Sequence, residues 1–359
     1  MSISKKNIVI EKITNSRIGE VDFNNLAFGQ VFTDHMYECD FKNGEWQTPV
    51  IKPYGPISMY PSAKVFHYGQ AVFEGMKAYK AEDDSIWMFR PDENQKRINI
   101  SSKRLQMPDF PEELFFDGLE TLLKLDREWI KKGNGNSMYI RPFVIATENG
   151  VSASPSNEYK FMFLLSPAQS YFKSGSKGVK VLFANEYSRS ANGGVGFAKA
   201  AGNYAGQFYP THLAQEKGYQ QVVWTDASNH ENLEEAGVMN VFFRINDTLI
   251  TAPTSDRILD GITRKSIIEV AKDEGIHVEV RNITVHEVEA AAKNNTLKEM
   301  FGAGTAAVIS PIIGFGYNNE DFELPNQENS YADLLRKRIT DIQTNKAEDK
   351  FGWRYKVKE

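Results

Sequence analysis

Lys199 stands in a stretch of small residues that could hold a reactive amine. The run Gly193-Gly194-Val195-Gly196-Phe197-Ala198 precedes it, and Ala200-Ala201-Gly202 follows it. Glycine allows the backbone to approach a flat ligand closely. Apolar surroundings disfavour the charged form of lysine, which makes its amine available as a nucleophile. The run lacks the G-x-x-x-x-G-K-[ST] pattern of a nucleoside-triphosphate loop, and taken alone it also fits a lysine at a solvated surface.

Two adjacent acids, Glu234 and Glu235, come directly before an apolar stretch that is typical of a strand. Successive strand residues face opposite sides of a sheet, so we expect only one of the two carboxylates to point inward. A buried carboxylate needs a cationic partner, because an unpaired buried charge is too costly. The pair therefore predicts one acid that can meet a positively charged group.

Two turns could bind an anion through the backbone. Asp260-Gly261 precedes a predicted helix, and the free N–H groups at a helix N-terminus attract anions. The run from Phe301 to Ala307 is a second turn of small residues, and it carries the hydroxyl of Thr305. An amine, a buried acid and two anion-binding turns are the groups that pyridoxal 5′-phosphate requires: a lysine, an acid at the pyridine nitrogen and a phosphate cradle.

The elements that position these residues are a mixture of strands and helices. Apolar and alternating runs predict strands over residues 75–90 (two strands around a turn), 137–147, 159–167, 179–184, 220–225, 241–245 and 277–281. Apolar residues at helical spacing predict helices over residues 91–106, 112–132, 204–217, 263–274 and 331–344. The mixture predicts an α/β fold with layers of the α+β type rather than an all-helical or all-β fold.

The chain of 359 residues is long enough for two domains. A polar stretch rich in glycine and serine, residues 173–178, interrupts the pattern and is the predicted linker. We therefore expect a smaller N-terminal domain over residues 1–172 and a larger C-terminal domain over residues 179–359, which carries Lys199.

Composition and charge argue against several classes of function. The net charge is −5 without clusters of Lys and Arg, so a nucleic-acid-binding surface is not expected. Cys39 is the single cysteine, which excludes an intrachain disulfide and a zinc site of several thiolates. The six histidines show no metal-ligand spacing, so we expect no metal. No apolar run is long enough for a bilayer and the N-terminal residues lack a signal-peptide core, so we expect a cytoplasmic protein without a membrane partner.

The sequence resembles the branched-chain amino-acid aminotransferases of the fold-type IV pyridoxal-phosphate enzymes. An ordered set of motifs over most of the chain carries the resemblance: Phe73 to Ala78 (F-E-G-M-K-A), Tyr139 to Pro142 (Y-I-R-P), Gly193 to Gly196, Lys199 to Tyr204, Glu235 to Asn240, Gly261 to Arg264, Phe301 to Ala306 and Asn326 to Asn329. The family implies reversible amino-group transfer between L-leucine, L-isoleucine or L-valine and 2-oxoglutarate through a pyridoxal-phosphate imine, with ping-pong kinetics. It also implies L-glutamate and the branched 2-oxo acids as partners, and a homodimer or higher homo-oligomer.

The resemblance implies a role at the cofactor for several residues. Lys199 is expected to form the imine and to carry the proton between Cα and the cofactor's C4′. Glu235 is expected to keep the pyridine nitrogen protonated, while its neighbour Glu234 is solvated or structural. Tyr204 would donate to the ring oxygen. The phosphate would be bound by the Arg97 guanidinium, by the backbone of Ile262 and Thr263, and by the hydroxyl of Thr305.

Tyr139 and Arg141 are two residues apart on a predicted strand, so their side chains project to one face. A phenol beside a guanidinium suits a carboxylate at the edge of an apolar pocket. In the family this pair serves substrate recognition, and the arginine accepts the distal carboxylate of glutamate. The family further implies that the backbone of Thr305 and Ala306 holds the α-carboxylate, and that the pocket aromatics are Tyr68, Phe73 and Tyr171.

Some positions depart from the family or stay open. Arg189 is either an ion-pair partner or a site residue, and Arg264 is expected to form a structural ion pair. Val238 stands where some relatives have threonine. Ala307 and Ser310 replace the C-x-x-C pair of mammalian relatives, so no thiol switch of that kind is expected.

Three alternatives differ from the branched-chain enzyme in substrate or in chemistry. D-amino-acid aminotransferases and aminodeoxychorismate lyases share the fold type, but they are usually shorter, and the Y-x-R and F-E-G-M-K-A segments favour the branched-chain group. A phosphate-ligand-binding protein without catalysis would form no covalent bond at Lys199.

Overall fold

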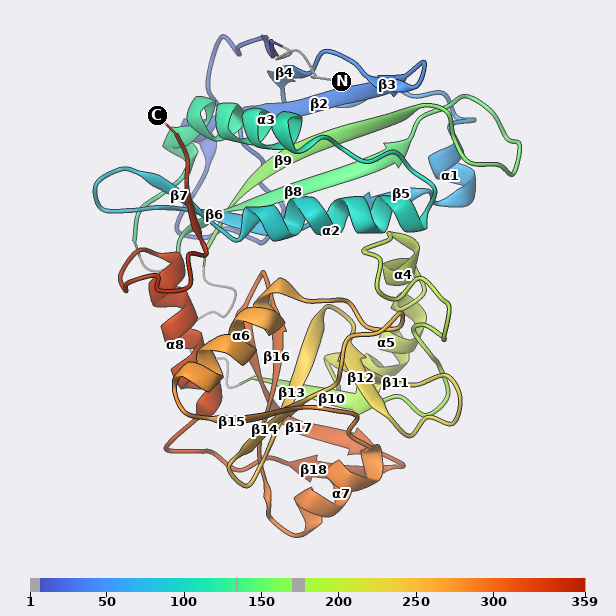
Figure 1. Ribbon diagram of the computed structural model, residues 1–359, viewed down its shortest axis with the longest axis vertical. Coiled ribbons are helices and arrows are strands. Elements are labelled where there is room, and N and C mark those ends of the chain that lie inside the picture. The colour runs from blue at the N-terminus through green and yellow to red at the C-terminus, as the bar shows by residue number, and fades with distance from the viewer. Residues whose placement is uncertain (1–6, 134, 170–177, 359) are drawn as a thin grey trace. The chain divides into compact units, whose positions relative to one another are not determined.

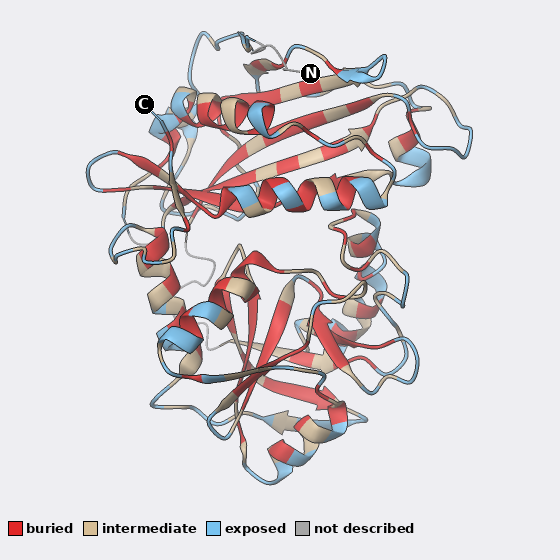
Figure 2. Cartoon of the chain, in the orientation of Figure 1, coloured by how far each residue is buried: buried red, intermediate tan, exposed pale blue. Residues whose placement is uncertain are grey.

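The computed structural model describes residues 7–133, 135–169 and 178–358. The chain forms two compact units (Figure 1). The first unit consists of Met1–Tyr171, Lys199–Ala201 and Gln343–Glu359, and the second consists of Phe172–Ala198 and Gly202–Ile342. Each unit contains its own mixed sheet, and the strands of both sheets are largely buried (Figure 2).

The sheet of the first unit has ten strands in the order β1-β4-β2-β9-β8-β6-β7-β19, with β3 paired to β2 and β5 paired to β8. Its longest neighbours, β8 and β9, pair in antiparallel register over ten residues each. The strands are β1 Val9–Ile10, β2 His35–Lys42, β3 Glu45–Trp46, β4 Val50–Pro53, β5 Ala71–Phe73, β6 Met76–Lys80, β7 Ile86–Phe89, β8 Ser137–Ala146, β9 Tyr159–Ala168 and β19 Arg354–Lys356.

Two helices, α2 (Pro91–Arg104) and α3 (Glu112–Leu125), run along this sheet (Figure 1), and the short helix α1 is Lys64–Tyr68. Helix α3 begins with two glutamates, which suit the positive end of the helix dipole. Its residues Phe115, Leu119 and Leu122 recur at helical spacing and are fully buried in the core of the unit. The strand core against which they pack includes Tyr37 and Phe161.

The sheet of the second unit has nine strands in the order β12-β11-β10-β17-β16-β13-β14-β15, with β18 paired to β17. Strand β12 also pairs with β13, so six of these strands close into a barrel. The strands are β10 Val179–Phe183, β11 Gln221–Thr225, β12 Leu233–Ala236, β13 Met239–Ile245, β14 Thr248–Thr251, β15 His277–Val280, β16 Leu297–Gly304, β17 Val308–Tyr317 and β18 Glu320–Glu323. The helices are α4 Gly202–Ala205, α5 Phe208–Glu216, α6 Ile262–Asp273, α7 Val285–Lys293 and α8 Tyr331–Gln343.

The mixed α/β fold class is confirmed, and most predicted elements are present within one or two residues of their predicted ends. Two predicted helices are shorter. The helix predicted over residues 112–132 ends at Leu125, and a short 3₁₀ helix, Arg127–Trp129, follows it. Between them, the carboxylate of Asp126 accepts hydrogen bonds from the backbone and ring of His35 on β2. The helix predicted over residues 204–217 is divided into α4 and α5 by a turn at Gly206 and Gln207.

The two compact units and the two predicted domains contain different segments of the chain. The division at Tyr171 and Phe172 lies next to the predicted boundary at residue 172, and linker residues 173–177 lie outside the described residues. However, the C-terminal segment joins the first unit, because β19 pairs with β7. Lys199–Ala201 also belongs to the first compact unit, whereas the prediction assigns the lysine to a larger C-terminal domain.

None of the helices in the described residues is long and apolar enough to cross a membrane.

Candidate active site

Lys199 is held against the first unit by its backbone. Its carbonyl accepts a hydrogen bond of 3.1 Å from the Phe73 amide, and the Ala201 amide donates to the Ala71 carbonyl at 3.0 Å, so the segment lies alongside β5. The Lys199 amide donates to the hydroxyl of Ser101 on α2 at 2.9 Å. The side chain is half-buried, and its Nζ lies 4.9 Å from the centroid of the Phe73 ring. Strand β5 and helix α2 therefore fix the position of the amine.

The Phe73 ring also contacts Arg141, whose Cζ lies 4.7 Å from the ring centroid. Nη2 of Arg141 donates a 2.9 Å hydrogen bond to the Tyr139 hydroxyl, so the predicted shared face of these two residues on β8 is confirmed. Nε of Arg141 is buried and has no hydrogen-bond partner among the described residues. One aromatic ring thus contacts both a lysine amine and a guanidinium with an unmet donor.

Gly75 makes room for the Tyr139 hydroxyl. A Cβ atom at residue 75 would collide with the phenol oxygen and ring of Tyr139. Only glycine at residue 75 therefore leaves room for this phenol, whose hydroxyl accepts the hydrogen bond from Arg141.

Arg97, on α2, forms an ion pair with Glu74, a residue for which the sequence predicts no role. Its Nε and Nη2 donate to the two oxygens of Glu74 at 2.7 and 2.8 Å. Burial tends to raise the pKa of Glu74, but the Arg97 charge and hydrogen bonds, with a contribution from the Lys199 charge, hold that pKa below its ordinary value. The signal that could have identified Glu74 is an acid placed between the apolar residues of β5 and β6, since a buried acid requires a cation.

In the second unit, Glu235 on β12 is a buried carboxylate that contacts Arg189, Leu259 and Asn240. Its Oε1 lies 2.7 Å from Nη1 of Arg189 and accepts the Leu259 amide at 3.1 Å, while its Oε2 accepts Nδ2 of Asn240 at 3.1 Å. Arg189, which the sequence left open, is thus the ion-pair partner of Glu235. The adjacent Glu234 pairs with Arg257.

Both of these carboxylates are buried, whereas we expected only one of them to point inward, so Glu234 is structural rather than solvated. Glu234 and Glu235 are both about 3% exposed, and all four residues of β12 are buried. The prediction assumed a sheet with one face exposed to solvent. Strand β12 instead pairs with β11 and β13 in the closed barrel, and its residues are buried on both faces. Each carboxylate consequently has its own arginine. Burial raises the pKa of Glu234, and the Arg257 hydrogen bond and charge oppose that increase.

Helix α6 begins at Ile262, one residue before the predicted start at Thr263, and its N-cap residue, Gly261, has no side chain to cap the first turn. Gly261 adopts an extended conformation before it, and a Cβ there would collide with the side chain of Asn240, the partner of Glu235. Thr263 is buried in the first turn. The second anion turn, with Thr305 and Ala306, connects β16 to β17, and both residues are half-buried.

The remaining candidates have varied positions. Tyr204 lies half-buried on α4, and Arg264 donates to the Ala252 carbonyl rather than forming an ion pair with a carboxylate. Tyr68, on α1, is 45% exposed and donates to the Val151 carbonyl. Val238 is 60% exposed between β12 and β13. Tyr171 lies outside the described residues.

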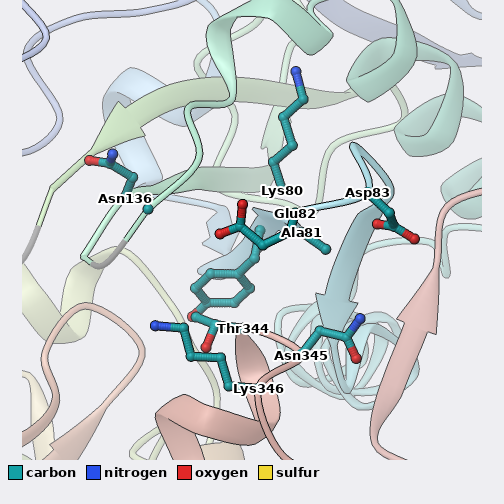
Figure 3. A pocket seen from close by; sticks show the side chains of 10 residues that line it. Lys80, Ala81, Glu82, Asp83, Asn136, Thr344, Asn345 and Lys346 are labelled. Carbon is teal, nitrogen blue, oxygen red and sulfur yellow. The ribbon is translucent and has the colours of Figure 1, made fainter.

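A cavity of about 280 Å³ in the first unit contains none of the candidate residues (Figure 3). Its walls come from the β6–β7 hairpin and from the segment after α8, and they carry both acids and lysines. Glu82 and Lys346 are among the side chains that line it. This cavity is therefore separate from the set of residues around Lys199 and Phe73.

The chain matches known proteins over most of its length. The model of the class IV aminotransferases matches residues 71–314. Branched-chain-amino-acid aminotransferase 2 of Bacillus subtilis is 44% identical over 99% of this chain and 98% of its own, and branched-chain-amino-acid transaminase 1 of the same organism is 44% identical over 94% of this chain and 95% of its own.

Solved structures of branched-chain amino acid aminotransferases are similar to this chain in fold. The branched-chain amino acid aminotransferase of Escherichia coli has a TM-score of 0.73 over 90% of this chain and 99% of its own, and at 22% identity it supports the fold alone. The T.th. branched-chain amino acid aminotransferase with pyridoxamine 5′-phosphate has a TM-score of 0.72 at 26% identity, over 89% of this chain and 98% of its own. By the extent of these matches, the chain belongs to the class IV aminotransferase family.

Proposed function

We propose that this protein is a branched-chain amino-acid aminotransferase, which transfers the amino group reversibly between L-leucine, L-isoleucine or L-valine and 2-oxoglutarate. Relatives that are 44% identical over almost the whole chain carry the branched-chain name. The observation that carries the proposal within the structure is Arg141, whose buried Nε has no partner among the described residues although its Nη2 is fixed by Tyr139.

The residues of this chain fit pyridoxal 5′-phosphate, the cofactor of class IV aminotransferases. The fit rests on a half-buried lysine amine, a buried carboxylate in Glu235 and a helix start at Ile262 whose first turn lacks a side-chain cap. Uncapped N–H groups and the helix dipole favour a phosphate. The cofactor supplies an aldehyde that bonds to amines and a ring that withdraws electrons.

Each residue would then bind the cofactor, orient it or transfer a proton. Lys199 would hold the cofactor covalently and, when released, carry the proton between the substrate Cα and the cofactor's C4′. Glu235, held by Arg189 and Asn240, would keep a proton on the pyridine nitrogen. Tyr204 would donate to the ring oxygen. The phosphate would be held by Arg97, Ile262, Thr263 and Thr305.

One substrate site would accept both an acidic and an apolar side chain. Arg141 and Tyr139 would bind the distal carboxylate of glutamate or 2-oxoglutarate, because a guanidinium with an unmet buried donor gains most from an anion. Phe73 offers an apolar face beside them. The other contacts that we propose are the backbone of Thr305 and Ala306 for the α-carboxylate, and the rings of Tyr68 and Tyr171 for the aliphatic side chain.

A transamination panel tests the function. The holoenzyme is given 2-oxoglutarate with L-leucine, L-isoleucine, L-valine or D-alanine as the donor, and glutamate formation is measured. The three branched-chain donors should support turnover in a ping-pong pattern, and D-alanine should not. Turnover with D-alanine alone would instead identify a D-amino-acid aminotransferase, and no turnover with any donor would contradict the transaminase assignment.

We also propose that the protein acts in the cytoplasm as a homodimer or higher homo-oligomer. The first unit exposes a group of apolar side chains on and near α1, and a second copy of the chain would cover it. Phe66 is 59% exposed, Tyr60 is 67% exposed and Val151, joined to α1 by the Tyr68 hydrogen bond, is 63% exposed. Light scattering should give at least twice the monomer mass for the wild type and a smaller mass for Phe66→Asp. A monomeric wild type would contradict this assembly.

A further inference from the structure

Glu74 is a completely buried acid that has no role in the function proposed above. It lies between β5 and β6 and is 0% exposed. Oε1 accepts Nε of Arg97 at 2.7 Å, and Oε2 accepts Nη2 of Arg97 at 2.8 Å and Nδ2 of Asn94 at 2.7 Å. The Gly75 amide donates to Oε2 at 3.2 Å. Two parallel bonds to one carboxylate fix both the position and the plane of the Arg97 guanidinium.

The charges in this cluster explain why a buried acid is tolerated. The charge and hydrogen bonds of Arg97, with a smaller contribution from the charge of Lys199, keep the pKa of Glu74 below its ordinary value and so stabilise its ionised form. Without Glu74, Arg97 would lose the buried carboxylate that accepts hydrogen bonds from its Nε and Nη2, and removing one partner of a buried ion pair is costly. Glu74 is therefore the buried counter-charge that holds Arg97.

We propose that Glu74 is a positioning residue, which holds the Arg97 guanidinium in the orientation that meets the cofactor phosphate. The inference rests on the proposed function, since it takes Arg97 as a phosphate ligand. A long arginine side chain loses conformational freedom when it binds an anion, and the bidentate bond to Glu74 removes that freedom before the phosphate arrives. Glu74 acts only through Arg97. It does not itself contact the phosphate, because its carboxylate and the phosphate are both negatively charged and would repel each other.

The second unit offers a matched control for a merely structural ion pair. Arg244 and Glu299 are also joined at 2.7 Å, and both side chains are about 10% exposed or less. Neither belongs to the candidate site. Removing the carboxylate of Glu299 should therefore reproduce the loss of a buried ion pair without changing how a phosphate is bound.

The experiment compares the affinity of the apoenzyme for pyridoxal 5′-phosphate with its affinity for pyridoxal, which lacks the phosphate. Both ligands are followed by absorbance in the wild type, Glu74→Gln, Arg97→Gln, the double variant and Glu299→Gln. Glu74→Gln should weaken binding of the phosphorylated ligand by about tenfold or more, equivalent to roughly 1.4 kcal/mol, and leave pyridoxal almost unchanged. The double variant should bind no more weakly than Arg97→Gln alone, and Glu299→Gln should keep the wild-type ratio.

Two outcomes would overturn the role of Glu74. One is an unchanged ratio of the two affinities in a folded Glu74→Gln enzyme, and the other is additive losses in the double variant. If Glu74→Gln does not fold, Asn94→Ala loosens the same carboxylate while keeping its charge, and the ratio should fall about threefold, since one hydrogen bond is worth about 1 kcal/mol or less here. An unchanged ratio in Asn94→Ala would then refute the role. If the wild-type apoenzyme bound pyridoxal 5′-phosphate and pyridoxal with equal affinity, that result would instead contradict the proposed phosphate site.

Discussion

Nη2 of Arg141 donates to the Tyr139 hydroxyl across 2.9 Å, two residues back along strand β8. This bond, together with the contact of the guanidinium with the Phe73 ring, fixes the orientation of Arg141. Its Nε nevertheless remains buried without a partner among the described residues. An unmet buried donor costs about 1–3 kcal/mol. A substrate carboxylate would remove that cost when it binds, which is why glutamate and 2-oxoglutarate should depend on this side chain.

Replacing Arg141 with alanine should therefore separate the two substrate classes. We expect kcat/KM for glutamate to fall by roughly 100-fold, because breaking a buried charged hydrogen-bond pair costs about 2–5 kcal/mol. The value for leucine should fall by less than about tenfold, since an aliphatic side chain loses no charge partner. Steady-state kinetics with both donors measure the difference. Tyr139→Phe keeps the ring and removes the hydroxyl acceptor, so it should lower kcat/KM for glutamate by a smaller factor. Equal losses of kcat/KM for glutamate and leucine in Arg141→Ala would contradict a selective role.

Glu234 and Glu235 form a natural pair of matched variants. Both are buried, adjacent on β12 and paired with an arginine, yet only Glu235 is assigned to the pyridine nitrogen. Glu235→Gln should lower kcat by about 100-fold or more, as loss of a key electrostatic group in an active site does, and should shift the absorbance of the bound cofactor. Glu234→Gln should leave that absorbance unchanged. The assignment fails if the two variants behave alike or if Glu234→Gln has the larger effect on the spectrum.

Lys77 on β6 predicts a dependence of stability on pH. Burial lowers the pKa of Lys77 to about 8, whereas a lysine in the unfolded chain titrates near 10.4. Between these values the unfolded chain binds more protons, so the Lys77 contribution makes the free energy of unfolding rise with pH. At and below neutral pH both states are protonated, and the buried charge destabilises the fold in full.

Lys77→Met should thus stabilise the apoenzyme at pH 7 by roughly 2–3 kcal/mol, and the gain should shrink as pH approaches 10. Denaturant unfolding at several pH values between 7 and 10 measures it. Lys80→Met is the control, because Lys80 lies on the same strand and pairs with Asp84 at 3.5 Å; it should bring no such gain. A gain in Lys77→Met that is constant across this pH range would count against the titration of Lys77 as its source.

Sequence patterns predicted those parts of the molecule that depend on short-range spacing. The apolar periodicity of α3 and the alternation along β8 place Phe115, Tyr139 and Arg141 correctly, since each pattern repeats within a few residues. The glycine before α6 likewise predicts the helix start to within one residue, since α6 begins at Ile262 rather than at Thr263.

Features that depend on distant pairing could not be read in this way. The ion pairs Arg189–Glu235 and Arg97–Glu74 join residues far apart in sequence, so only the folded chain identifies the partners. The closure of the second sheet by β12 and β13 buries both faces at Glu234, which local alternation cannot reveal. Similarly, the return of β19 to β7 depends on pairing between the C-terminus and an early hairpin.

The account depends most directly on the amine of Lys199. Borohydride reduction of the holoenzyme, followed by proteolysis and mass spectrometry, shows which residue carries the cofactor. We predict a phosphopyridoxyl mass on the peptide that contains Lys199, with loss of turnover in Lys199→Ala at an unchanged unfolding temperature of the apoenzyme. A label on another lysine, or wild-type rates in Lys199→Ala, would contradict the account.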